Sequence, residues 1–228
     1  MSEYHNTKAE DRVPLGQKLA VGAGGFPIQN GGLIVQYMAQ PIFQIFLGLN
    51  PALFGLAMTI PRIWDAFTDP VMGRISDRTQ SRYGRRRPYV FFGALAVALT
   101  FLTIWMVPQS MGDTGTFLWL TIGSVLFFTA FTVFSVPFNA LVYEQTPDYH
   151  ERTRLMFYLA LFYNIGNLCV NWYVPATNWS GFENPLVGAR WIALCLALVV
   201  FIGMGILPAI FGKERFYNVA QKENKDIG

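Results

Sequence analysis

Three ionisable residues, Arg62, Asp65 and Asp69, fall within a segment that is otherwise apolar enough to lie in a membrane. On a helix, the two aspartates are four residues apart and share a face, and Arg62 lies on the same side. Each unpaired charge at mid-membrane costs about 2.5–3.5 kcal/mol on insertion scales, so we expect Arg62 to pair with one aspartate. The other carboxylate then leaves one surplus negative charge, which suits a single monovalent cation or a proton.

The alternative interpretation of this triplet is a buried Arg–Asp network that only locks helices together. Two aspartates for one arginine argue against it, because a purely structural pair leaves no surplus charge. Intramembrane carboxylates mark ion pathways. Thr132 is a candidate neutral ligand, since hard cations prefer oxygen, although such a hydroxyl can also bond its own helix backbone.

The elements that must position these residues are predicted to be membrane helices. The chain of 228 residues is 53% hydrophobic and 14% charged, whereas a soluble domain carries about 25% charged residues. Long stretches without charge predict an all-α membrane protein with six spans. The spans are expected at about residues 19–47, 51–75, 89–107, 116–143, 155–174 and 189–211. They divide the chain into an N-terminal segment (1–18), a six-helix bundle (19–211) and a polar tail or start of a central loop (212–228).

Every lysine and arginine except Arg62 and Arg190 falls in segments on one side of these spans. The positive-inside rule therefore predicts a multi-pass protein of the cell membrane (plasma or inner) with both termini in the cytoplasm. An even number of spans likewise requires both termini to lie on the same side of the membrane. The tryptophans near predicted span ends are expected to be interfacial anchors: Trp105, Trp119, Trp172, Trp179 and Trp191. Basic residues in short loops argue against a nucleic-acid partner.

The predicted loop between the second and third spans is rich in arginine. Asp77, at a helix end, can meet an arginine or the positive end of another helix, and Gly73 lets the second helix approach a neighbour. Such contacts can hold one conformation of the bundle and break in another. The residues of this candidate conformational-switch loop are Gly73, Asp77, Arg78, Gly84, Arg85 and Arg86. The alternatives are a signal for topology alone and a site for anionic lipid headgroups.

The segment RIWDAFTDPVMGRISDRTQSRYGRRRP resembles the glycoside–pentoside–hexuronide:cation symporters of the major facilitator superfamily, the melibiose-carrier family. The resemblance covers roughly residues 15–217. It implies the N-terminal six-helix bundle of a major facilitator fold and cation-coupled symport of a sugar, glycoside or related solute by alternating access. It places the coupling-cation site on Asp65, Asp69 and Thr132, with Thr68 where the sugar carrier has asparagine. The coupling ion is Na⁺ or H⁺, and no other cofactor is implied.

The same resemblance places the substrate site on Gln29, Ser135 and Asn139. Gln29 and Ser135 stand where the sugar carrier has acids, and Asn139 stands where it has tryptophan. Ala160 stands where it has arginine. Gln29 and Asn139 can still hydrogen-bond a sugar, but the charged residues that the sugar carrier has at the substrate site are absent from the matching positions.

Two further segments, GGFPIQ (24–29) and IWMVP (104–108), look similar to the lysophospholipid symporters of the same superfamily. This keeps open a lysolipid-type carrier. Family members have twelve spans and bind substrate between two halves, so the resemblance implies a C-terminal half or a second copy as partner, besides solute and membrane lipids. The rival from another class is a truncated membrane fragment that transports nothing. An enzyme is not expected, because His5 and His150 lie far apart and no nucleophile–base set accompanies them.

Overall fold

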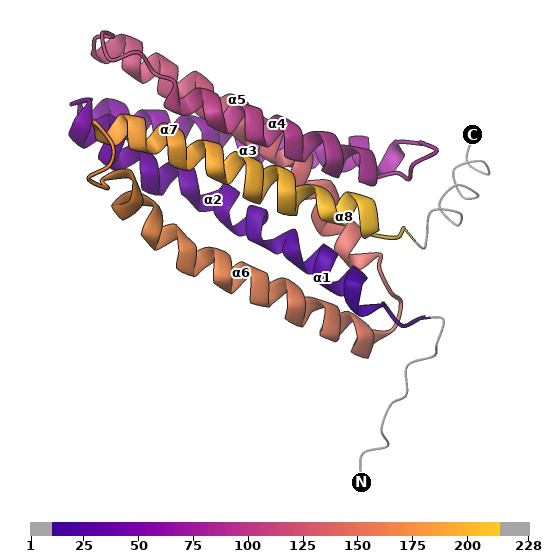
Figure 1. Ribbon diagram of the computed structural model, residues 1–228. Helices are drawn as coiled ribbons and strands as arrows, with labels where there is room; N and C mark the ends of the chain where they lie inside the picture. The colour runs from indigo at the N-terminus through magenta and orange to yellow at the C-terminus, as the bar shows by residue number, and fades with distance from the viewer. Residues whose placement is uncertain (1–10, 215–228) are drawn as a thin grey trace.

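The computed structural model describes residues 11–214, and every regular element in that range is helical (Figure 1). Helices α1 (Leu15–Ala23) and α2 (Gly25–Ala39) continue into a π-helical segment, η2 (Gln40–Phe46), as one rod. The next four rods are α3 (Pro51–Arg78), α4 (Arg87–Trp105), α5 (Asp113–Tyr143) and α6 (Tyr149–Thr177). The last rod joins α7 (Pro185–Leu196), η3 (Ala197–Met204) and α8 (Gly205–Phe211). Six rods between residues 11 and 214 confirm the all-α prediction.

Local sequence fixes where several rods begin. Asn50 and Asn184 each precede a proline at the first helical position, where the missing N–H of proline costs nothing. The Asn50 side chain accepts from the Ala52 N–H, and the Asn184 side chain accepts from the Val187 N–H, both at 2.9 Å. Helix α3 therefore begins where its span was predicted to begin, whereas α7 begins before the predicted span 189–211.

The first rod contains two prolines, and the predicted switch loop is shorter than expected. Pro27 lies in the first turn of α2, where its missing N–H is tolerated, and the break between α1 and α2 is at Gly24. Pro41 lies at the start of η2. Gly73, Asp77 and Arg78 belong to the last turns of α3 and not to a loop.

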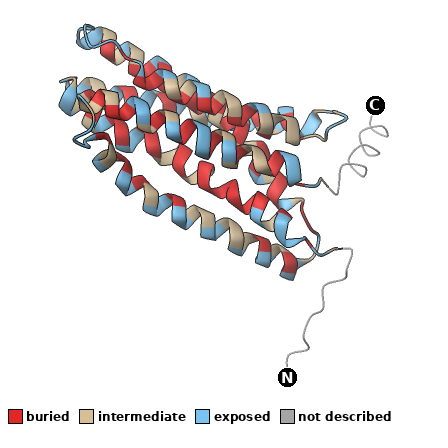
Figure 2. Cartoon of the chain, in the orientation of Figure 1, coloured by how far each residue is buried: buried red, intermediate tan, exposed pale blue. Residues whose placement is uncertain are grey.

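The rods pack into one elongated bundle, with α5 against both α3 and α4 and with α6 along α1 and α2 (Figure 1). At its core, the Phe101 ring lies 5.4–5.8 Å from the rings of Phe201, Phe127 and Trp105. Trp105 is fully buried, so its predicted role as an interfacial anchor is wrong. Figure 2 shows that residues on α1 and α2 are mostly buried, while α6 exposes much of its surface.

Three rods of the described chain are long and apolar enough to cross a membrane: α4, α5 and the rod from α7 to α8. The rods α3 and α6 hold the polar residues considered below. The α3–α4 loop, the start of α1 and the end of α8 lie at one end of the bundle, called here the arginine-loop end (Figure 1).

Candidate functional site

The carboxylates of Asp65 and Asp69 meet Thr132 at the seam between α3 and α5. The Thr132 Oγ1 lies 2.8 Å from an Asp65 oxygen and 3.0 Å from an Asp69 oxygen. The four-residue spacing brings both carboxylates to the same side of α3, as their positions in the sequence predict. Thr132 is buried, Asp65 is partly buried and Asp69 is exposed, so the cluster is open on one side.

Thr68 adds a second hydroxyl to this cluster. Its Oγ1 donates to the Asp65 carbonyl at 3.2 Å and lies 3.5 Å from the Thr132 Oγ1. The structure thus brings together all four residues of the predicted cation site. Their side chains present carboxylate and hydroxyl oxygens, the ligand type that hard cations prefer.

Arg62 does not pair with either aspartate, which corrects the prediction made for it. Its guanidinium donates to the Gly32 carbonyl at 2.9 Å and lies 4.6 Å from the centre of the Phe128 ring. None of the ion pairs within residues 11–214 includes Arg62, Asp65 or Asp69. Both carboxylates therefore lack a basic partner in ion-pair contact.

The predicted substrate residues lie on two different elements. Ser135 and Asn139 follow Thr132 on α5 at helical spacing and so share its face. Gln29 lies on α2, and its side-chain amide donates to the Asn167 side chain of α6 at 3.3 Å. No hydrogen bond within residues 11–214 joins Gln29 to Ser135 or Asn139.

The contact with Gln29 identifies a row of amides that sequence reasoning missed. Asn164, Asn167 and Asn171 are exposed on α6, and their spacing places them along one face. The asparagines at this spacing were a signal in the sequence. Helix α6 therefore presents polar groups beside Gln29.

The predicted switch residues form a network at the arginine-loop end. One Arg86 guanidinium nitrogen bonds Asp77 at 2.6 Å and the other bonds Glu144 at 2.6 Å, and Arg85 bonds the same Glu144 oxygen at 2.6 Å. Glu144, at the end of α5, was missed because it lies 59 residues from Arg85. Gly73 and Arg78 take no part in these ion pairs.

Glu214 closes the same network from the other end of the chain. Its carboxylate accepts from the backbone N–H groups of Arg85, Arg86 and Arg87 at 2.7–3.1 Å. A side chain on Gly84 would come within 2.8 Å of Glu214, and Gly84 adopts a φ of 106°, which favours glycine. The loop thus wraps around the Glu214 carboxylate.

An ion pair joins α1 to α6 at the same end of the bundle. The Glu151 carboxylate lies 2.6 Å from the Lys18 ammonium and accepts from the Val13 N–H at 2.9 Å. Glu151 precedes the predicted span 155–174. Burial alone raises the pKa of Glu151, but the hydrogen bonds from Lys18 and Val13 and the charges of Lys18 and Arg154 together lower it below its ordinary value.

Comparison with known proteins identifies the family of this chain. A family model described as MFS/sugar transport protein matches residues 20–227. The uncharacterized symporter sll1374 of Synechocystis is 36% identical over 60% of this chain and 26% of its own length. The sodium-dependent lysophosphatidylcholine symporter 1 of Gallus gallus is 30% identical over 64% of this chain and 27% of its own. The putative glycoside/cation symporter YagG of Escherichia coli is 27% identical over 76% of this chain and 35% of its own.

The match is confined to part of each relative, since the aligned stretch covers only about a quarter to a third of its length. The family model, by contrast, spans nearly the whole of this chain. The chain therefore belongs to the MFS/sugar transport family, among the proteins similar to glycoside–pentoside–hexuronide:cation symporters.

Proposed function

We propose that this chain forms the N-terminal, six-span half of a cation-coupled solute symporter, with Asp65 and Asp69 as its coupling-ion site. The observation that carries this proposal is the pair of carboxylates that share the Thr132 hydroxyl and have no basic ion-pair partner. A Na⁺ ion or a proton supplies the missing positive charge. The arginine-loop end faces the cytoplasm, in accordance with the positive-inside rule.

The site links cation binding to the arrangement of the rods. Without a cation, the two carboxylates repel each other, and one Thr132 hydroxyl has a single proton to donate. A bound cation attracts Asp65 and Asp69 on α3 and the Thr132 oxygen on α5, so it favours the state in which these rods lie together. The network of Arg85, Arg86, Asp77 and Glu144 joins the same two rods at the arginine-loop end.

The solute lies beside the polar face formed by Gln29 and the asparagines of α6, against a second bundle. This second bundle is a C-terminal half or a second copy of the chain. Gln29, Asn167 and Asn139 offer neutral amides, which suit the hydroxyl groups of a sugar or glycoside. The likeness to the glycoside/cation symporter YagG favours such a solute.

A lysolipid is the second candidate solute. An apolar cavity of about 370 Å³ lies between α3 and α5, and its lining includes Trp64, Phe67 and Val71 as well as Thr68 and Thr132. An acyl chain in this cavity would lie directly beside the cation site. The likeness to the lysophosphatidylcholine symporter favours this candidate.

The cation site is tested first by binding, which requires no second half. The purified chain is titrated with NaCl against choline chloride at several pH values while its thermal unfolding is followed. Binding of Na⁺ raises the unfolding temperature, and Asp65→Asn and Asp69→Asn each remove that rise. Asp113→Asn, on an exposed residue at the start of α5, is the matched control and keeps the rise. A response to Na⁺ that survives both substitutions contradicts the proposed site.

Transport is tested in proteoliposomes with a panel of glycosides and lysolipids, with the chain alone and with a second half co-expressed. Uptake that follows a Na⁺ or proton gradient and fails in Asp65→Asn supports the symporter. Glycoside and lysolipid uptake separate the two candidate solutes. Cation binding without uptake under either condition identifies the rival, a fragment that transports nothing.

A further inference from the structure

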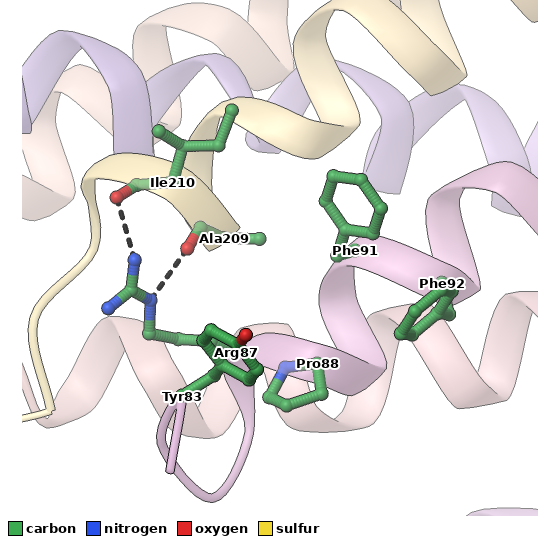
Figure 3. Close-up of a pocket in the computed structure, with 7 residues that line it drawn as sticks. All are labelled: Tyr83, Arg87, Pro88, Phe91, Phe92, Ala209 and Ile210. Atoms are coloured by element: carbon green, nitrogen blue, oxygen red, sulfur yellow. Dashed lines mark hydrogen bonds between the residues drawn. The ribbon is translucent and has the colours of Figure 1, made fainter.

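An apolar groove with a basic rim lies at the arginine-loop end, between the start of α4 and the end of α8. Its volume is about 490 Å³ (Figure 3). Phe91, Phe92 and Pro88 of α4 and Ile210 of α8 form apolar walls, and Tyr83 and Arg87 lie at one end. The groove is separate from the cation site, none of whose residues lines it.

The groove opens toward the surroundings of the bundle. Phe92 is 66% exposed, Tyr83 is 62% exposed and Ile210 is 53% exposed. Both walls belong to rods that are long and apolar enough to cross a membrane. The groove therefore lies where a span ends, so that its apolar walls face acyl chains and its rim lies at the level of the headgroups.

The two arginines at the rim, Arg82 and Arg87, form no ion pair within residues 11–214. The Arg82 side chain is exposed, its guanidinium lies 4.7 Å from the centre of the Tyr83 ring, and it enters none of the ion pairs within residues 11–214. Arg87 donates from Nε to the Ala209 carbonyl at 2.6 Å and from one terminal nitrogen to the Ile210 carbonyl at 2.8 Å. Figure 3 shows its other terminal nitrogen without a hydrogen bond to the residues drawn.

We propose that this groove binds an anionic glycerophospholipid of the adjoining leaflet. The phosphate lies against Arg82, the Tyr83 hydroxyl and the remaining terminal nitrogen of Arg87, and one acyl chain lies along Phe92 and Ile210. The rim supplies the charge that an anionic headgroup needs, and the groove supplies the apolar surface that a free phosphate cannot use. A lipid in this position bridges the α3–α4 loop and the end of α8.

The headgroup contact is tested by native mass spectrometry of the chain released from nanodiscs with equal amounts of phosphatidylglycerol and phosphatidylcholine. We expect phosphatidylglycerol to be retained preferentially, and Arg82→Gln to reduce its retention about fivefold, the effect of one arginine at a membrane surface. Arg78→Gln is the matched control, because Arg78 is also exposed near the same end but, unlike Arg82, does not lie over the ring of Tyr83, which lines the groove. Equal losses in the two variants would mean a diffuse effect of surface charge and would overturn the proposal.

The acyl-chain contact is tested separately. Phe92→Ala removes part of the groove wall and is expected to reduce retention of long-chain phosphatidylglycerol. Phe157→Ala, on a residue of similar exposure on α6, leaves retention unchanged. Inorganic phosphate added in excess does not displace the lipid. Displacement by phosphate, or equal retention of the two lipids by the unmodified chain, would contradict a lipid site in this groove.

Discussion

A single hydroxyl stands between two carboxylates at the centre of the candidate site. The Thr132 hydroxyl has one proton, yet both Asp65 and Asp69 lie within hydrogen-bond distance of its oxygen. At any moment one carboxylate therefore lacks this donor. A cation resolves the conflict, because it accepts lone pairs from all three groups at once.

Substitution of Thr132 separates the roles of its hydroxyl and its shape. Thr132→Val keeps the shape but removes the oxygen, and we expect Na⁺ to bind about tenfold more weakly, the equivalent of one lost ligand of about 1.4 kcal/mol. Thr132→Ser keeps the oxygen and is expected to bind within about twofold of the unmodified chain. Titration of the unfolding temperature with NaCl measures both. Equal affinities for Na⁺ in the valine and serine variants would show that the hydroxyl is not a ligand.

For single residues, the sequence predicted that Asp65 and Asp69 lie close together, but it did not predict the hydrogen-bond partner of Arg62. The spacing of Asp65 and Asp69 determines their shared face on any helix. The partner of Arg62 is the carbonyl of Gly32, on a different rod and 30 residues away. A backbone carbonyl carries no signal in the sequence, so the acceptor that replaced the expected ion pair could not be read from it.

Close approach of the rods is tested at two neighbouring glycines of α2. A side chain on Gly31 would come within 2.1 Å of the Phe131 ring of α5, whereas Gly32 has no such neighbour within 4 Å. We expect Gly31→Ala to destabilise the bundle by about 1–3 kcal/mol, because the partly buried Phe131 ring must move. Gly32→Ala is the matched control and is expected to be neutral or slightly stabilising, since alanine favours a helix.

Thermal unfolding in detergent compares these two variants directly. A Gly31→Ala chain that unfolds at the same temperature as the Gly32→Ala chain would show that α2 and α5 do not approach as closely as described.

The cap that Glu214 provides for α4 is tested by removing its carboxylate. Glu214→Ala leaves the N–H groups of Arg85, Arg86 and Arg87 without their acceptor, and we expect a loss of about 1–2 kcal/mol of stability, as for other helix caps. Glu183→Ala, on an exposed residue before α7, is the matched control. If both substitutions lower the unfolding temperature equally, the cap contributes nothing specific.

The rods themselves were predictable from apolar runs, whereas the contacts that lock their ends were not. Each predicted span overlaps a helical rod because a stretch of apolar residues of that length has few other structures available. Glu214 meets Arg85 across 129 residues, and Glu144 meets it across 59. Such partners are determined by how the rods pack, which local pattern does not record.

The stability of the bundle should depend on pH through Glu151. The partners of this carboxylate place its folded-state pKa below the ordinary value of 4.5. Its contribution to stability is therefore fully present above pH 4.5 and is lost as the pH falls through the lower, folded-state pKa. We expect the unfolding temperature to fall on acidification, and Glu151→Gln to make this fall smaller. Glu183→Gln is the control, and an unchanged pH dependence in Glu151→Gln would remove Glu151 from this role.

The distribution of polar groups over the whole bundle indicates which side faces lipid. Asn164, Asn167 and Asn171 are exposed on α6. The amides of Asn164 and Asn171 donate to carbonyls of their own helix, but their side-chain oxygens accept no hydrogen bond within residues 11–214, which is costly in hydrocarbon. Leu99, by contrast, is exposed on α4, among apolar residues. We therefore infer that the asparagine face borders water or a second bundle, while the Leu99 face borders acyl chains.

Single cysteines distinguish these two faces in membranes. In a background in which Cys169 and Cys195 are replaced by serine, Asn167→Cys is expected to react with a hydrophilic maleimide, because its thiol lies in water and can ionise. Leu99→Cys, at a position that is also exposed on the bundle, is expected to stay unlabelled because lipid excludes both the reagent and the thiolate. If a second bundle covers α6, labelling at position 167 appears only in the state that opens the cavity, and added solute changes its rate. An inert cysteine at position 167 in every condition, together with a reactive one at position 99, would reverse the assignment of the two faces and with it the position of the solute.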